Sequence, residues 1–149
     1  CRASNPCIPF DYKIDGCYAR AHWMSKLISE KYGYSSKKIF VTGKLRAINS
    51  GTCKDKCVRW GYHVAPLVKV KTKEGKVEKM VIDPSLYDQP VSIKGWISAQ
   101  ESKCPSLRSP GKHKKYWTTP AAQLYPSGGI DPNYKITKKV MKKYCRKCR

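Results

Sequence analysis

The chain has 149 residues, which is the length of one domain, and its formal net charge is +21 because 31 Lys and Arg oppose 10 Asp and Glu. No stretch approaches the roughly 20 apolar residues that a membrane-spanning helix needs, so the composition excludes a protein anchored by such a helix. Aromatic residues and cysteines are spread along the whole chain, which excludes a disordered basic tail. We therefore expect one folded domain over residues 1–149.

The first predicted element is a helix from Cys17 to about Tyr32. Asp15 is expected to cap its N-terminus and Gly33 to end it. Apolar residues recur at helical spacing along it: Ala21, Met24, Leu27, Ile28 and Tyr32.

The middle of the chain changes to the pattern of strands. Residues 39–42 and 60–71 are rich in β-forming residues, and residues 77–82 read as a return strand. Turns are expected at residues 49–52 and 73–76, where polar residues and glycine gather. A helix followed by neighbouring strands predicts an α+β fold with the helix packed on an antiparallel sheet.

Residues 84–135 are rich in proline, so they are expected to form long loops with short elements. Residues 134–144 favour a final helix by their apolar spacing. A dense basic patch lies in this predicted helix and in the residues after it: Lys138, Lys139, Lys142, Lys143, Arg146, Lys147 and Arg149. We interpret this patch as a solvated cationic surface, with an acidic protein partner as the first alternative and nucleic acid as the second.

Eight cysteines in a chain of this length indicate disulfides and an oxidising compartment: Cys1, Cys7, Cys17, Cys53, Cys57, Cys104, Cys145 and Cys148. The pairs Cys53–Cys57 and Cys145–Cys148 have spacings that zinc could use, but no histidine flanks them. We expect neither a metal nor a cofactor. If Cys17 is a free thiol, seven cysteines are left for at most three bridges, whose connectivity the sequence does not fix.

Cys17 stands at the start of the predicted helix, where the helix dipole and backbone N–H groups favour a thiolate and can bind an oxyanion. A nucleophilic cysteine also needs a base and a group that orients the base. A hairpin centred on residue 73 would place His63 opposite Asp83, so these residues complete a candidate triad. The alternatives are a bridged Cys17, a structural His63 and an Asp-Pro turn at Asp83.

Other residues near the candidate triad are weaker candidates. Arg20 shares the helix face of Cys17. Trp60 and Tyr62 flank the predicted base and could wall a substrate cleft, with packing in the core as the equal alternative for either one. His22 lies about 140° around the helix from Cys17 and is therefore interpreted as structural.

Several segments resemble the secreted bacterial protein-glutaminases, in the order and spacing of that family. They are Ser4–Ile8, Asp15–His22, Ser50–Cys53, Trp60–Ala65 and Ile82–Leu86, within roughly residues 1–90. The resemblance implies a papain- or transglutaminase-like fold, a single catalytic domain, and a Cys-His-Asp triad on Cys17, His63 and Asp83. It also implies deamidation of glutamine side chains in proteins or peptides, with release of ammonia.

Two other functions stay open at this point. One is a delivered deamidase toxin with a narrow protein target and an acidic immunity partner. The other is a non-enzymatic, disulfide-rich cationic binding protein in which Cys17 is bridged. We expect a secreted bacterial monomer, made with a pro-segment or held by an acidic inhibitor, with no membrane span and no nucleic-acid partner.

Overall fold

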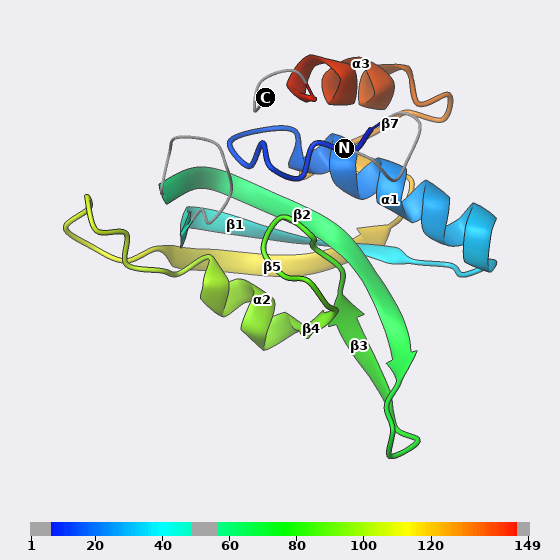
Figure 1. Ribbon diagram of the computed structural model, residues 1–149, viewed down its shortest axis with the longest axis horizontal. Coiled ribbons are helices and arrows are strands. Elements are labelled where there is room, and N and C mark those ends of the chain that lie inside the picture. Colours follow the sequence, from blue (N-terminus) through cyan, green and yellow to red (C-terminus); the bar gives the residue numbers. More distant parts are fainter. Residues whose placement is uncertain (1–6, 49–56, 146–149) are drawn as a thin grey trace.

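A five-stranded antiparallel sheet forms the centre of the computed structural model, which describes residues 7–48 and 57–145 (Figure 1). The strand order is β4-β3-β2-β1-β5, and β6 and β7 form a separate small hairpin. The elements in chain order are α1 (Cys17–Tyr32), β1 (Lys37–Ile48), β2 (Cys57–Lys71), β3 (Val77–Val81), β4 (Val91–Ser92), α2 (Ile93–Ala99), β5 (Lys112–Pro120), β6 (Gln123–Tyr125), β7 (Gly128–Ile130) and α3 (Lys135–Tyr144).

The helices cover both faces of the sheet. Figure 1 shows α1 on one face with α3 outside it, and α2 on the opposite face. Alternating side chains of β1 make this possible, since Ile39 and Val41 pack with Trp96 of α2 while Phe40 packs with Ala21 of α1. A further apolar cluster, which includes Trp23 and Met141, joins α1 to α3. The molecule is therefore layered as α3, α1, sheet and α2.

The predicted α+β fold is confirmed, and the helix at residues 17–32 has the expected bounds. Gly33 ends it in the left-handed conformation, at φ 62°. The predicted cap was wrong, because the N-cap is Gly16 and no side chain caps the helix. The final helix is also confirmed, as α3.

Two of the three predicted strands are longer than the sequence indicated, whereas β3 ends at Val81, one residue before the expected end. β1 runs on to Ile48 and β2 begins at Cys57, and the turn at residues 73–76 is present. The nine-residue strand β5, within the segment expected to be loops, was missed. The predicted turn at residues 49–52 lies outside the described residues.

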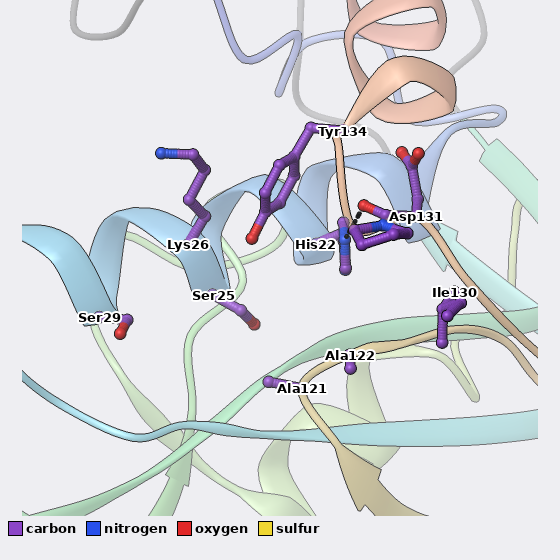
Figure 2. Close-up of a pocket in the computed structure, with 10 residues that line it drawn as sticks. His22, Ser25, Lys26, Ser29, Ala121, Ala122, Ile130, Asp131 and Tyr134 are labelled. Atoms are coloured by element: carbon purple, nitrogen blue, oxygen red, sulfur yellow. Dashed lines mark hydrogen bonds between the residues drawn. The ribbon is translucent and has the colours of Figure 1, made fainter.

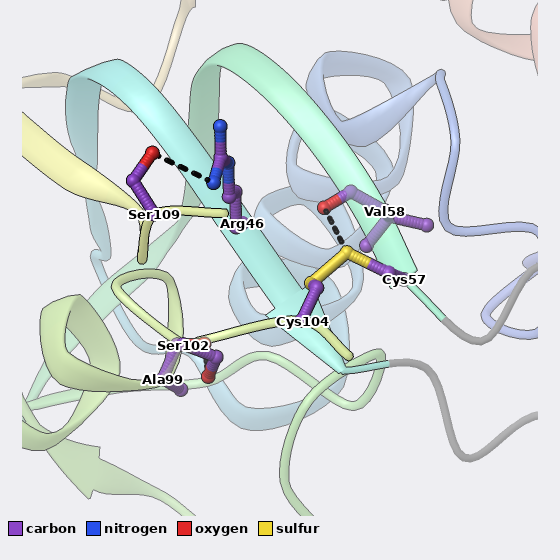
Figure 3. The surroundings of a disulfide bond; sticks show 7 residues. All are labelled: Arg46, Cys57, Val58, Ala99, Ser102, Cys104 and Ser109. Carbon is purple, nitrogen blue, oxygen red and sulfur yellow. Dashed lines mark hydrogen bonds between the residues drawn. A yellow bond between two sulfur atoms is a disulfide. The ribbon is translucent and has the colours of Figure 1, made fainter. Parts of the chain in front are cut away.

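A disulfide joins Cys57, at the start of β2, to Cys104 in the loop after α2 (Figure 3). Cys57 is thereby removed from the zinc pair that its spacing with Cys53 suggested. Cys7 is also disulfide-bonded, whereas Cys17 is a free thiol. The alternative function that needed a bridged Cys17 is therefore wrong.

Among the described residues, no helix is long and apolar enough to cross a membrane. Within the same ranges, no group of three or more histidine, cysteine or acidic side chains is placed to hold a metal ion.

Candidate active site

Cys17 is the first residue of α1, and the loop before it is held from two sides. Gly16 has φ 81°, and a Cβ built there would lie 2.8 Å from the Tyr144 ring of α3, so both backbone and space require glycine. Asp15 accepts hydrogen bonds from the Gly16 N–H and from the Tyr144 hydroxyl. The approach to Cys17 is thus fixed by α3, which lies far away in sequence.

Arg20 also holds this loop in place. Its guanidinium is buried and donates to the carbonyl oxygens of Tyr12, at 2.7 Å, and Asp15, at 2.8 Å. It also interacts electrostatically with Cys17 and Asp83. These contacts position the loop and place a buried positive charge close to the thiol and the carboxylate.

His63 lies on the central strand β2 and is almost fully buried. Its Nε2 is 2.8 Å from Oδ2 of Asp83, which follows β3. The ring stacks on Trp60, with centroids 4.4 Å apart and planes 6° from parallel, and lies 5.6 Å from the ring of Trp96. Two tryptophans and one carboxylate therefore fix the orientation of this imidazole.

Asp83 accepts four hydrogen bonds although it is 3% exposed. Oδ2 accepts from His63 and from Trp96 Nε1, at 2.8 Å, while Oδ1 accepts from the Ser85 N–H and hydroxyl. Burial alone would raise the pKa of Asp83, but the charge of His63 and these hydrogen bonds hold it well below its ordinary value. The carboxylate is therefore ionised beside His63.

The same pair sets the protonation state of His63. Burial alone would lower its pKa, but the charge and hydrogen bond of Asp83, together with interactions with Cys17, raise it to about 9. Nε2 is engaged by Asp83, and Nδ1 has no hydrogen bond to any described oxygen or nitrogen atom. Nδ1 is thus the nitrogen available to exchange a proton with Cys17.

The predicted register of the hairpin needs correction. Leu67 pairs with Val81, so the hairpin is centred on residue 74 rather than 73. His63 and Asp83 are consequently diagonal neighbours on one face of the sheet rather than direct partners. Their side chains still meet, because the diagonal spacing lies within reach of an imidazole and a carboxylate.

The two aromatic residues that were predicted to contact substrate occupy different positions. Trp60 is 8% exposed, and its indole N–H donates to the carbonyl of Lys13. Tyr62 is half-buried and packs on the cluster that contains Cys17. Burial, and then the charge of Cys17, raises the pKa of the Tyr62 hydroxyl. Substrate contact by Trp60, Tyr62 and Arg20 stays a prediction.

His22 lies away from the candidate triad, at a cavity of about 290 Å³ between α1 and the β6–β7 region (Figure 2). Its Nε2 is 3.1 Å from the carbonyl oxygen of Asp131, and Lys38 Nζ is 2.9 Å from its Nδ1. Burial lowers the pKa of Lys38 to about 7. Both ring nitrogens of His22 are thus used in structural contacts, in agreement with its predicted role.

Sequence reasoning missed Trp96 and Ser85, which complete the shell around Asp83. Ser85 had a local signal, because a hydroxyl two residues after an aspartate can bond that carboxylate. No local pattern pointed to Trp96. It lies on the seven-residue helix α2, which covers the face of the sheet opposite α1, and only the fold brings it to Asp83.

Comparisons with known proteins were made for the sequence and the fold. The profile of a family described as glutaminase matches residues 1–100. A crystal structure of protein-glutaminase is 41% identical with a TM-score of 0.81, and the match covers 95% of this chain and 75% of that one. The NMR structure of protein-glutaminase from Chryseobacterium proteolyticum is 40% identical with a TM-score of 0.80, covering 96% and 76%.

A crystal structure of pro-protein-glutaminase is 40% identical with a TM-score of 0.82, covering 95% of this chain and 50% of that longer one. No curated protein sequence matches the chain.

Proposed function

Because this chain belongs to the protein-glutaminase family, we propose that Cys17, His63 and Asp83 carry its deamidation of protein-bound glutamine. The observation that carries the assignment is the His63–Asp83 hydrogen bond of 2.8 Å, which leaves Nδ1 for the thiol at the start of α1. The raised pKa of His63 supports an imidazolium at neutral pH, able to interact with the Cys17 sulfur.

In the first step, the Cys17 sulfur attacks the carbonyl carbon of the glutamine side-chain amide. Backbone N–H groups at the start of α1 stabilise the oxyanion. The C–N bond then breaks as His63 gives its Nδ1 proton to the amide nitrogen, which departs as ammonia, and the acyl group remains bound to Cys17 as a thioester.

In the second step, His63 takes a proton from water, and the resulting hydroxide attacks the thioester carbon. The C–S bond breaks, releasing the carboxylic acid and restoring the thiolate and the imidazolium. Asp83 holds the ring and stabilises its positive charge throughout. The released carboxylic acid gives its proton to ammonia, so the sum is glutamine plus water giving glutamate plus ammonium.

The covering of Cys17 supports a side-chain amide as substrate. The residue is 6% exposed, and Tyr18 and Tyr62 pack around it. A slender side chain can enter such a site more easily than a peptide main chain, so hydrolysis of the glutamine side chain is favoured over proteolysis.

The direct test measures ammonia release from casein and from a blocked glutamine dipeptide, with intact mass recorded in parallel. We expect ammonia and mass gains of amide-to-acid conversion from the parent chain, and neither from Cys17→Ala. Ammonia from Cys17→Ala at the parent rate would refute the assignment. Ammonia from many unrelated proteins would exclude the narrow-target toxin.

The remaining expectations concern the whole protein. We propose that residues 1–149 form a single catalytic domain and that the protein is a secreted bacterial monomer. The solved pro-forms of similar proteins support the expectation of a pro-segment. An acidic inhibitor protein would contact the cationic surface that the basic residues at the C-terminal end of the chain form.

A further inference from the structure

The outer face of α3 carries five exposed lysines, which we call the α3 lysine face: Lys135, Lys138, Lys139, Lys142 and Lys143. The helix contains no acidic residue, and none of the five forms an ion pair with a carboxylate among the described residues. The charge of this face is therefore not neutralised within the described part of the molecule.

This arrangement works against the helix itself. Lys135 and Lys139 are four residues apart, as are Lys138 and Lys142, and like charges at that spacing destabilise a helix. Lys135 also opposes the helix dipole, because it is the first residue of α3. The helix is held instead by Asp131, which accepts from two N–H groups of its first turn, and by its buried side. The stability of the fold therefore does not explain why lysines occupy these positions.

The α3 lysine face begins beside the candidate active site. Tyr144, at the end of α3, packs on Gly16 and stacks on Tyr12 with ring centroids 4.4 Å apart. Lys143 Nζ lies 5.2 Å from the centroid of the Tyr144 ring. A chain bound along α3 can therefore continue past its last turn toward Cys17.

We propose that the α3 lysine face binds an acidic stretch of the substrate protein and so favours glutamines a few residues away from it. The proposal rests on the deamidation proposed above. From Lys135 to Lys143 a helix rises about 12 Å, which an extended peptide spans with about four residues. The recognised feature is thus a short run of aspartate or glutamate.

The composition of the face favours carboxylates over nucleic acid. Within the described residues, α3 presents lysine alone, without the arginine fork that pairs with phosphate in two hydrogen bonds; Arg146 and Arg149 of the basic patch lie outside those residues. It also exposes no aromatic ring on which a base could stack, because Tyr144 is buried. Lysines act here as point charges, which suits a flexible acidic peptide.

The test uses two glutamine peptides of equal length, one with a run of four glutamates separated from the glutamine by a short spacer, and one with serines in that run. The variant is Lys139→Gln/Lys142→Gln, whose two lysines make no other contact among the described residues. The matched control is Lys73→Gln/Lys76→Gln, which removes the same charge at the β2–β3 turn, far from α3 (Figure 1).

The readout is the ratio of kcat/KM for the acidic peptide to kcat/KM for the serine peptide. We expect a ratio well above one for the parent chain at low salt, a fall of about fourfold in the α3 variant, and the parent ratio in the control. The expected fall is fourfold because each of the two lysine charges removed lowers the ratio about twofold, for opposite charges about 10 Å apart in water. High salt should bring the parent ratio toward one.

A parent ratio of one, or equal falls in the variant and the control, would overturn the proposal while leaving deamidation intact. Absence of ammonia from both peptides would overturn both. Polyglutamate should inhibit the parent chain more than the α3 variant. Inhibition by a single-stranded oligonucleotide and not by polyglutamate of equal charge would replace the acidic-protein assignment with nucleic acid.

Discussion

Asp83 is a buried carboxylate that stays ionised at the candidate active site. A buried carboxylate without partners would take up a proton, yet this one is surrounded by four donors and stays ionised. Its charge is then available to His63, which holds its own proton to higher pH as a result. The sequence predicted the pair, but of the further donors that keep Asp83 charged, Ser85 lies two residues away in the same loop and Trp96 comes from α2.

The Trp96 indole should matter for catalysis as well as for stability. Trp96→Phe removes the N–H that bonds Asp83 Oδ2 but keeps an aromatic ring beside His63. We expect a loss of about 1–3 kcal/mol in the free energy of unfolding and a lower kcat. Urea unfolding and steady-state kinetics measure the two effects.

Trp60→Phe is the matched control for that change. It also deletes an indole N–H beside His63, but that N–H bonds the main chain of Lys13. The control should lose stability but lower kcat less than Trp96→Phe does, because Asp83 keeps all its donors. A fall in kcat of equal size in both variants would contradict a role for Trp96 through Asp83.

The pH dependence of activity should follow His63. Protonated imidazole is the form that donates to ammonia, and its pKa is raised to about 9, so kcat/KM should fall as pH rises through about 9. Asp83→Asn removes the charge that opposes desolvation, so the limb should move to lower pH by about 1–3 units. An unmoved limb in the pH–rate profile of the variant would contradict the pairing.

Among the elements, predictability followed local sequence signals. Apolar residues at helical spacing and the glycine that follows gave the bounds of α1, although residues 19–25 are all buried because the helix lies between the sheet and α3. β5 is an edge strand whose side chains are mostly exposed, and an exposed strand has no apolar alternation to detect. Its place beside β1 is fixed by pairing with residues about 75 positions away, which no local pattern contains.

The β1 strand contains an irregularity at Gly43 that the sequence analysis also missed. The register with both neighbouring strands shifts there, Gly43 has φ 151°, and an added Cβ would lie 2.3 Å from the carbonyl oxygen of Lys112. We expect Gly43→Ala to lower the free energy of unfolding by about 2 kcal/mol or more, measured in urea.

Gly61 provides the comparison on the neighbouring strand. An added Cβ there meets no atom within 4 Å, so Gly61→Ala should change the free energy of unfolding by less than about 1 kcal/mol. Equal losses at the two glycines would contradict the account of Gly43.

At the scale of the whole molecule, cross-linking supplements the three apolar clusters found among the described residues. The Cys57–Cys104 bridge closes a loop of 47 residues and ties β2 to the chain after α2. Removing it by Cys57→Ala/Cys104→Ala should lower the free energy of unfolding by about 2–4 kcal/mol in urea. A loss below about 1 kcal/mol would show that packing alone holds this corner.

The net charge of +21 is a property of the whole molecule that the sequence states but does not explain. Composition alone could not separate a solvated surface from a binding surface. The fold adds that part of the charge lies on α3, whose end packs beside Gly16. Position in the fold, rather than the amount of charge, is what motivates a role in substrate choice.

The central claim is that the free thiol of Cys17 is the nucleophile, and selective alkylation tests it most directly. The native protein would be treated with iodoacetamide while activity is followed, and the modified residue would be located by peptide mass. We predict that activity falls in step with a single carbamidomethyl group on Cys17. Full activity with Cys17 alkylated, or full inactivation with Cys17 unmodified, would contradict the account.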